Sequence, residues 1–193
     1  MKRIILDTET TGLELGCRVL QLSYIVLDGN NEYQYCKNYF FAVDHVPEEV
    51  VEIHGFDTEY LKGLSKGKTF ADYYQELKRE LDWSWFIAHN AEFDYKHLQQ
   101  EFYRAGSYFV PGRVFCTMRF MVNKMQLPPR PGKFTYKFPK NSEMVRFLGI
   151  DESDALHFCA TEFGVSGINV HDARYDVAML YYCYLKMMEE YGK

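Results

Sequence analysis

The chain has 193 residues, of which 47% are hydrophobic, and carries a formal charge of −5 at neutral pH. This length can bury a substantial core, so we expect a single domain over residues 1–193. The negative charge argues against a protein that coats nucleic acid by electrostatics alone. No stretch approaches the roughly 18 apolar residues of a membrane span, and the opening MKRIILDTET lacks the apolar run of a signal peptide. We therefore expect a soluble, cytoplasmic protein with no membrane partner.

Strand patterns dominate the first part of the chain. Apolar and alternating residues predict strands over 4–7, 18–28 and 32–43, and the turn signal DGNN at 28–31 predicts a hairpin between the last two. Helices and short strands then alternate. The remaining expected elements are helices over 47–55, 69–83 and 91–106, strands over 85–90 and 114–116, a Pro-rich irregular segment over 127–141, and helices over 142–148, 154–163 and 172–190. This order predicts an α/β fold, with a mixed sheet and helices on its faces.

Two carboxylates end the first predicted strand. Asp7 and Glu9 are two residues apart, so alternation along a strand places both side chains on one face. Adjacent anions repel, and a fold tolerates them when water, a basic partner or a cation compensates the charge. Further acids near this strand end would favour a cation.

Two later segments supply such acids. Asp94 begins a helix directly after a buried strand, where functional side chains gather in α/β sheets. In the last helix, five residues separate His171 and Asp176, which on one ideal helix would point about 140° apart. They can converge only if His171 precedes the helix, with Asp172 as the N-cap residue. Taken alone, Asp94 is better explained by the preference of acids for a helix N-terminus, and His171 and Asp176 by a surface histidine and a solvated helical acid.

Four segments in this order carry a resemblance. LDTETTGL, IHG, HNAEFD and HDARYD resemble the motif set of the DEDDh 3′-to-5′ exonucleases of the ribonuclease H-like superfamily, over residues 4 to about 185. The resemblance implies a ribonuclease H-like mixed five-stranded sheet with helices on both faces. It also implies a phosphodiester hydrolase that releases nucleoside monophosphates from single-stranded or frayed 3′ ends.

The resemblance assigns roles to the acids. Asp7, Glu9, Asp94 and Asp176 would hold two divalent cations, Mg²⁺ or Mn²⁺, because an all-carboxylate set suits hard cations better than zinc. Glu9 and His171 would be the catalytic residues, with His171 as the general base that takes a proton from the attacking water.

The same resemblance suggests residues that hold the terminal nucleotide of the substrate. Leu13 would pack on the base, and His54 would line the same pocket as Asn90 and Phe93. For Leu13 and Phe93, packing in the core is an equally good explanation. His89 is interpreted as structural. The complete set of substrate-holding positions is Thr10, Thr11, Gly12, Leu13, His54, Asn90 and Phe93.

Several alternatives stay open from the sequence. We favour DNA as the substrate, with an exoribonuclease or oligoribonuclease on the same site as the alternative. A catalytically idle nucleic-acid-binding module and a polymerase proofreading subunit are further options. The chain stops soon after its last predicted helix, so we expect a free-standing monomer or small homo-oligomer, without an indicated polymerase partner.

One long window carries no acid. Residues 102–142 contain eight Lys or Arg and no Asp or Glu, which gives this window a charge of +8. Within it, Lys133, Lys137 and Lys140 are interleaved with aromatic residues on the Pro-rich segment. Backbone charge and stacking faces together suit single strands of nucleic acid, so we predict a strand-binding surface here. The alternative is that the basic residues scatter and the aromatic rings pack in the core.

Overall fold

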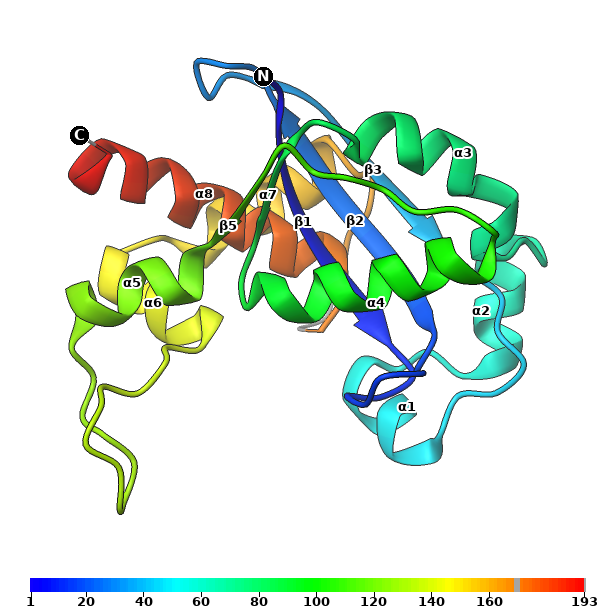
Figure 1. The fold of residues 1–193 in the computed structure, drawn as a ribbon, viewed down its shortest axis with the longest axis horizontal. Coiled ribbons are helices and arrows are strands. Elements are labelled where there is room, and N and C mark those ends of the chain that lie inside the picture. The colour runs from blue at the N-terminus through cyan, green and yellow to red at the C-terminus, as the bar shows by residue number, and fades with distance from the viewer. Residues whose placement is uncertain (169–170, 193) are drawn as a thin grey trace.

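The computed structural model in Figure 1 describes residues 1–168 and 171–192, and its centre is one sheet of five strands. The strands lie in the order β3-β2-β1-β4-β5. Their bounds are β1 Arg3–Thr10, β2 Val19–Leu27, β3 Tyr33–Phe40, β4 Trp85–Ala88 and β5 Arg113–Cys116. The pairs β1–β2 and β2–β3 are antiparallel, whereas β4 runs parallel to both β1 and β5. The predicted mixed five-stranded sheet is confirmed.

Helices cover both faces of this sheet, as Figure 1 shows. On one face lie α3 and α4, and on the other lies α8, with α6 and α7 packed against it. The helices are α1 Glu48–His54, α2 Thr58–Ser65, α3 Phe70–Leu81, α4 Ala91–Arg104, α5 Thr117–Met125, α6 Asn141–Leu148, α7 Glu152–Thr161 and α8 Ala173–Tyr191. Among the described residues, no helix combines the length and the apolar character needed to cross a bilayer.

Two of these helices are absent from the sequence-based expectation. Helix α2 contains Gly63, which lowers helix propensity, but Asp57 caps it by accepting a hydrogen bond of 2.7 Å from the Tyr60 amide. Helix α5 follows β5 without any intervening loop, and its N-cap position is Cys116, which gives no capping signal. The sequence signals for these two helices are therefore weak, and packing against the rest of the fold stabilises them.

Alternation along β1 sets the orientation of the functional residues. Ile5 packs in the core between the sheet and α8, whereas Ile4 and Leu6 pack in the core beneath α3 and α4. The same alternation directs Asp7 and Glu9 toward the α8 face and Thr8 toward the α4 face. The last residues of β1 therefore direct the carboxylates of Asp7 and Glu9 toward α8 and the hydroxyl of Thr8 toward α4.

Candidate active site

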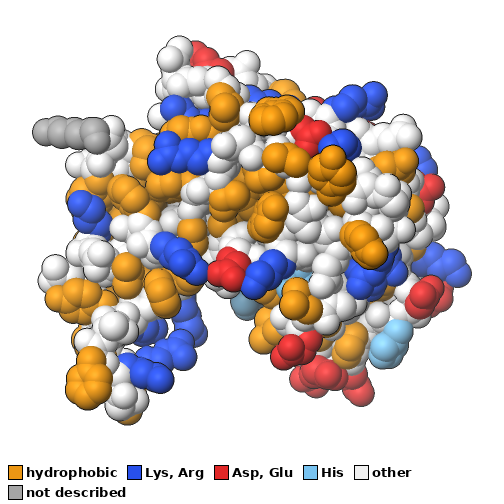
Figure 2. Space-filling view, viewed as in Figure 1, with side chains coloured by type: hydrophobic (Ala, Val, Ile, Leu, Met, Phe, Trp, Pro, Cys, Tyr) orange, Lys and Arg blue, Asp and Glu red, His pale blue; other side chains and the backbone are white. Residues whose placement is uncertain are grey.

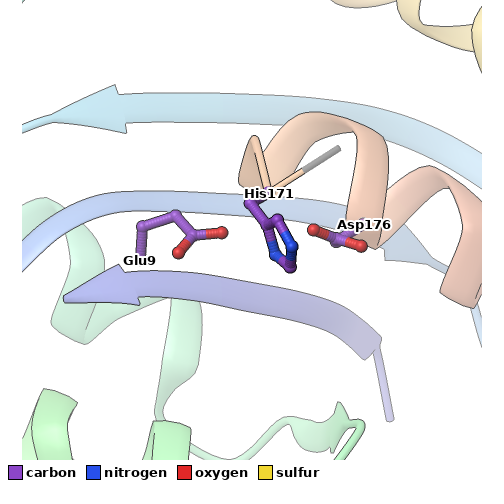
Figure 3. Close-up of side chains that lie close together, drawn as sticks. All are labelled: Glu9, His171 and Asp176. Carbon is purple, nitrogen blue, oxygen red and sulfur yellow. The ribbon is translucent and has the colours of Figure 1, made fainter. Parts of the chain in front are cut away.

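Four carboxylates gather where β1 ends, and we call them the acid cluster: Asp7, Glu9, Asp94 and Asp176. Glu9, His171 and Asp176 each offer a ligand atom, and these three atoms lie within 4.8 Å of one another. Figure 3 shows the His171 ring between the Glu9 and Asp176 carboxylates. Asp7 lies close enough to the other three acids that their charges raise its pKa. The structure thus brings together five residues drawn from β1, α4 and the start of α8.

Burial and mutual repulsion raise the pKa values of the acid cluster. Removal from water is the largest cause at each carboxyl; it raises the pKa of Glu9 to about 9, that of Asp94 to about 7 and that of Asp176 to about 6. The pKa of Asp7 is also raised, by removal from water and then by the charges of Asp176, Asp94 and Glu9. In the described part of the chain, no Lys or Arg forms an ion pair with these four acids. Within the site, the charge of His171 lowers the pKa of Asp176 and so opposes part of the effect of burial.

Thr8 holds Asp94 in place. Its backbone amide donates to Oδ1 of Asp94 over 3.1 Å, and its hydroxyl donates to the same oxygen over 2.8 Å. Both hydrogen bonds favour the ionised carboxylate and oppose the effect of burial on its pKa. This role could not be predicted from the sequence, where Thr8 is only the residue between two acids.

The start of α8 is fixed to the sheet by a buried polar network. Asp172 is the N-cap residue, and its Oδ1 accepts from the Arg174 amide and from Nε2 of Gln21, each over 2.9 Å. Gln21, on β2, accepts in turn from the Ala173 amide over 3.1 Å. His171 therefore lies outside the helix, in the left-handed region at φ 68°. The prediction that His171 precedes α8 is confirmed.

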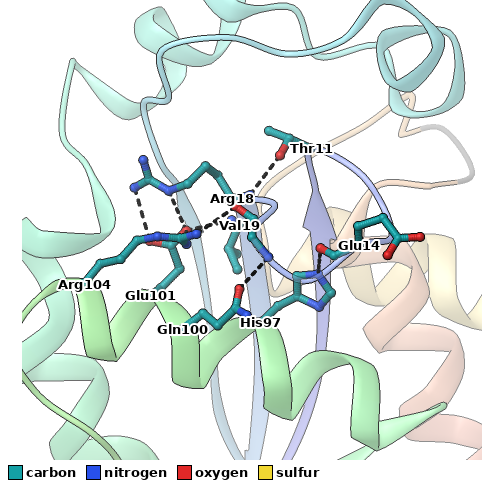
Figure 4. Close-up of polar contacts among 9 residues, drawn as sticks. Thr11, Glu14, Arg18, Val19, His97, Gln100, Glu101 and Arg104 are labelled. Carbon is teal, nitrogen blue, oxygen red and sulfur yellow. Dashed lines mark hydrogen bonds and ion pairs between the residues drawn. The ribbon is translucent and has the colours of Figure 1, made fainter.

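The turn that follows β1 is clamped onto α4, as Figure 4 shows. Glu101 is fully buried and accepts from Nε of Arg18 over 2.7 Å and from Nη1 of Arg104 over 3.0 Å. The preceding residue, Gln100, accepts from the Gly16 amide over 2.9 Å. These contacts hold the turn in a fixed position beside the acid cluster.

The residues that open this turn make hydrogen bonds within it. Thr10 donates to the Gly12 carbonyl over 2.6 Å, and the Thr11 hydroxyl accepts from the Arg18 amide over 2.8 Å. Gly12 has a φ of 155°, and a Cβ there would lie 3.0 Å from the Cys17 sulfur. The two hydroxyls and the glycine thus shape the turn, and both threonine hydroxyls already have protein partners.

Three of the predicted substrate-holding residues line one pocket of about 250 Å³: Leu13, Asn90 and Phe93. Leu13 is 83% exposed, so for this residue the alternative of core packing is wrong. Phe93 is half-buried, and its ring centroid lies 4.2 Å from that of His97. The pocket offers one exposed apolar side chain and one half-buried ring, an arrangement that can accept a planar base.

His54 lies on a different pocket, of about 490 Å³, with Phe56, Asp172 and Arg174. The prediction that it shares a pocket with Asn90 and Phe93 is therefore wrong. Its ring stacks on Phe56 and its Nδ1 accepts from the Phe56 amide over 3.0 Å, which fixes the ring at the end of α1. Burial and the nearby charge of His171 lower the pKa of His54.

Two further residues connect the acid cluster to the segment between α5 and α6. His89 lies 3.1 Å from the Thr117 hydroxyl through Nδ1 and 2.9 Å from the Pro139 carbonyl through Nε2, and burial lowers its pKa. The side-chain amide of Asn141 hydrogen-bonds the Asp176 carboxylate and lowers its pKa. Neither contact could be found by spacing, because each joins residues more than 25 positions apart.

Comparisons with known proteins agree with this site. The sequence model of a family described as exonuclease, RNase T, matches residues 4–184. The chain is 36% identical to the DNA polymerase III subunit epsilon of Rickettsia conorii over 106 residues, which cover 52% of this chain and 44% of that protein. It is 22% identical to the 3′-5′ exonuclease DinG of Bacillus subtilis over 167 residues, 86% of this chain and 17% of that protein. The chain thus spans less than half the length of these relatives.

Solved structures share the fold. Exonuclease X in complex with 5′ overhanging duplex DNA superposes with a TM-score of 0.66 and 19% identity, covering 98% of this chain and 93% of that one. Escherichia coli exonuclease I in complex with a dT13 oligonucleotide gives a TM-score of 0.69 and 14% identity, covering 98% of this chain and 41% of that one. With the family match over nearly the whole chain and the four acids and histidine of the motif set at one strand end, this chain belongs to the exonuclease family, in its DEDDh 3′-to-5′ branch with the ribonuclease H-like fold.

Proposed function

We propose that this chain is a metal-dependent 3′-to-5′ exonuclease that releases nucleoside 5′-monophosphates from single-stranded or frayed 3′ ends of DNA. The observation that carries the proposal is the convergence of Glu9, His171 and Asp176 within 4.8 Å, beside Asp7 and Asp94. A general base next to a set of carboxylates is the equipment that metal-assisted phosphodiester hydrolysis requires.

The acid cluster fits Mg²⁺ or Mn²⁺. All four acids offer hard carboxylate oxygens, no cysteine takes part, and their raised pKa values reflect a site that lacks positive charge. Asp7, Glu9, Asp94 and Asp176 would hold two such ions. When bound, the ions supply positive charge that lowers the pKa of water and stabilises the negative charge developing on the phosphodiester.

His171 takes the proton in the proposed reaction. Water attacks the phosphorus of the last phosphodiester, its proton passes to an imidazole nitrogen of His171, and the bond from phosphorus to the 3′-oxygen of the preceding nucleotide breaks. The leaving 3′-oxygen takes a proton from solvent water, and His171 returns its proton to solvent. The products are a nucleoside 5′-monophosphate and a strand that is one nucleotide shorter, with a new 3′-hydroxyl. The Asp172 and Gln21 network keeps His171 outside α8, which leaves its ring able to approach the water.

The pocket of Leu13, Asn90 and Phe93 would receive the terminal nucleotide. An exposed leucine and a half-buried ring can bracket a base from two sides, which favours an unpaired 3′ end over a stacked, paired one. Arg18 and Arg104 donate to Glu101, and Gln100 accepts from the Gly16 amide; these hydrogen bonds hold the turn that carries Leu13 against α4.

The test is digestion of DNA and RNA oligonucleotides, single- and double-stranded, labelled at either end, in Mg²⁺, in Mn²⁺ and in a chelator. We expect a 3′ label to appear at once as mononucleotide and a 5′ label to give a descending ladder, on DNA, only with metal. Release from the 5′ end, internal cutting, or equal rates in the chelator would contradict the proposal. Preference for RNA would move the substrate to the exoribonuclease alternative.

The relatives named DNA polymerase III subunit epsilon favour a second candidate, proofreading beside a polymerase. Addition of a DNA polymerase separates the two roles. A proofreading subunit should bind a replicative polymerase and remove a mismatched 3′ nucleotide from a duplex faster when that polymerase is present. A rate that the polymerase leaves unchanged supports the free-standing exonuclease.

A further inference from the structure

The segment 127–140, which we call the basic loop, leaves the body of the molecule between α5 and α6. In Figure 1 it projects beyond the helices as an extended, doubled-back loop. Its two internal backbone hydrogen bonds run from Lys133 to Arg130 over 2.9 Å and from Lys137 to Leu127 over 3.2 Å. The loop is therefore folded on itself and makes little contact with the core.

Three aromatic rings of the basic loop face solvent. Phe134 is fully exposed, Phe138 is 51% exposed and Tyr136 is 43% exposed. The alternative in which these rings pin the loop to the core is therefore wrong. An exposed aromatic ring gives up the free energy that its burial would contribute to folding. A group of such rings on one surface is therefore typical of a binding site.

The basic residues of the loop differ in their partners. Lys137 forms an ion pair with Glu143 at the start of α6, so its charge is already balanced. Arg130, Lys133 and Lys140 are exposed and form no ion pair with any residue that the structure describes. Figure 2 shows Lys and Arg side chains along the side of the loop that faces the body, with hydrophobic side chains on the outer side. Three unbalanced cations thus remain.

The base of the loop lies at the proposed active site. Pro139 contacts His89, the neighbour of Asn90, and Asn141, which begins α6, contacts Asp176. When the last nucleotide of a strand occupies the pocket beside Asn90, the base of the basic loop lies next to that nucleotide. The loop therefore leads outward from the acids, which repel phosphate, with cations that attract it.

We propose that the basic loop holds the single-stranded part of a polynucleotide upstream of its 3′ end. Arg130, Lys133 and Lys140 contact backbone phosphates, and unpaired bases stack on Phe134 and Tyr136. A hollow of about 280 Å³ between the basic and aromatic side chains of the loop gives room for a base. Duplex DNA would satisfy the cations but has no free base faces for the rings, so an unpaired strand fits both features. This inference rests on the proposed function, because it supplies the strand that the active site shortens.

The test compares two matched triple variants. The loop variant carries Arg130→Gln, Lys133→Gln and Lys140→Gln, and leaves Lys137 in place because its ion pair supports α6. The control variant carries Lys62→Gln on α2, Lys66→Gln at the C-cap of α2 and Arg79→Gln on α3, all exposed and on the far side of the molecule from the loop. Both variants lose three positive charges. A difference between them in strand binding therefore depends on where in the molecule the charges lie.

Two substrates separate binding of the strand from chemistry. On a 30-nucleotide dT strand, the loop variant should show a KM about tenfold higher than the control. Its slope of log kcat/KM against log salt should be shallower by about 2, since each lost contact to a single strand removes about 0.7. On the nitrophenyl ester of thymidine monophosphate, which needs only the active site, the two variants should match. A third variant, Phe134→Ala with Tyr136→Ala, should also raise KM for the dT strand but leave the salt slope unchanged.

Direct binding provides a readout that does not depend on turnover. Fluorescence anisotropy of labelled dT strands in the chelator should give a Kd about tenfold weaker for the loop variant than for the control. Equal KM, Kd and salt slope in both triple variants would overturn the inference, even with full exonuclease activity. Lost binding of a protein partner or an altered oligomeric state, with strand binding intact, would overturn it as well. Absence of hydrolysis of both substrates by the unmodified chain would instead overturn the proposed function.

Discussion

The acid cluster and the basic loop handle charge in opposite ways. In the acid cluster, four carboxylates of one sign are forced together by β1, α4 and α8 and held by hydrogen bonds from Thr8 and Asn141. In the basic loop, cations are spread over an exposed segment with few contacts. A fold can keep like charges close together only when packed helices and strands hold them in place. The repulsion between these charges then lowers the free energy of unfolding. The comparison predicts that changes in the cluster affect chemistry and stability, whereas changes at the unpaired cations of the loop, Arg130, Lys133 and Lys140, affect only binding of the strand.

The largest effect is expected from Asp176→Asn and Asp7→Asn. Each keeps the side-chain shape and removes one charged ligand, so kcat in Mg²⁺ should fall by about 10³-fold or more. The melting temperature without metal should rise, since repulsion within the cluster falls. Asp154→Asn, at an exposed acid on α7, is the control and should change neither quantity. Near-normal turnover by Asp7→Asn would refute the assignment of this acid as a metal ligand.

The next largest effect is expected from His171→Asn. Loss of the general base should lower kcat by about 10²-fold, with binding of metal and of the dT strand largely kept. The control is His45→Asn, at an exposed histidine. The profile of rate against pH decides the role. If the acidic limb stays in the His171→Asn variant, another group is the base.

The pH dependence of stability tests the repulsion directly. The pKa values of Glu9 at about 9, Asp94 at about 7 and Asp176 at about 6 exceed the ordinary values of 4.5 and 3.8. Between about pH 4 and pH 9 the folded, metal-free chain therefore holds protons that the unfolded chain releases. Its free energy of unfolding should fall as pH rises through this window, by at most about 1.4 kcal/mol per pH unit for each group.

Thermal unfolding at pH 5 to 9, in the chelator and in Mg²⁺, measures this dependence. The decline should be shallower in Asp176→Asn and weaker in Mg²⁺, because bound cations compensate the ionised acids. A stability that rises with pH in the chelator, or an identical decline in Asp176→Asn, would contradict the electrostatic account.

The smallest effect is expected from Lys137→Gln, on the other side of the comparison. Its ion pair with Glu143 is partly exposed, so the variant should lose about 0.5 kcal/mol of stability. The salt slope for dT strands should stay close to that of the unmodified chain, because this charge is already balanced. If Lys137→Gln reduces the salt slope as much as Arg130→Gln or Lys133→Gln does, the ion pair opens and Lys137 binds phosphate.

The sequence predicted the parts of the site that depend on local periodicity. Alternation along β1 places Asp7 and Glu9 on one face, and the capping preference of Asp172 leaves His171 outside α8. The contacts that fix these residues were not predictable. Thr8 meets Asp94 across 86 positions, and Glu101 meets Arg18 across 83, so each contact depends on how α4 packs on the sheet.

The division of the substrate-holding residues into two pockets also depends on packing. His54 stacks on Phe56 at the end of α1 and lines another pocket than Leu13 and Phe93, and no motif encodes the contact with Phe56. Helices α2 and α5 were missed for a related reason: α2 contains Gly63 and α5 begins without a capping residue, and both helices are too short to be stable without their neighbours.

The central claim is that the acid cluster is a centre for divalent cations, and binding of Mn²⁺ tests it most directly. Titration calorimetry with thymidine monophosphate present should count two Mn²⁺ ions per chain. The count should fall to one or none in Asp7→Asn and in Asp176→Asn, and stay at two in Asp154→Asn. An unmodified chain that binds no Mn²⁺ at millimolar concentration, or equal binding by all of these variants, would contradict the account.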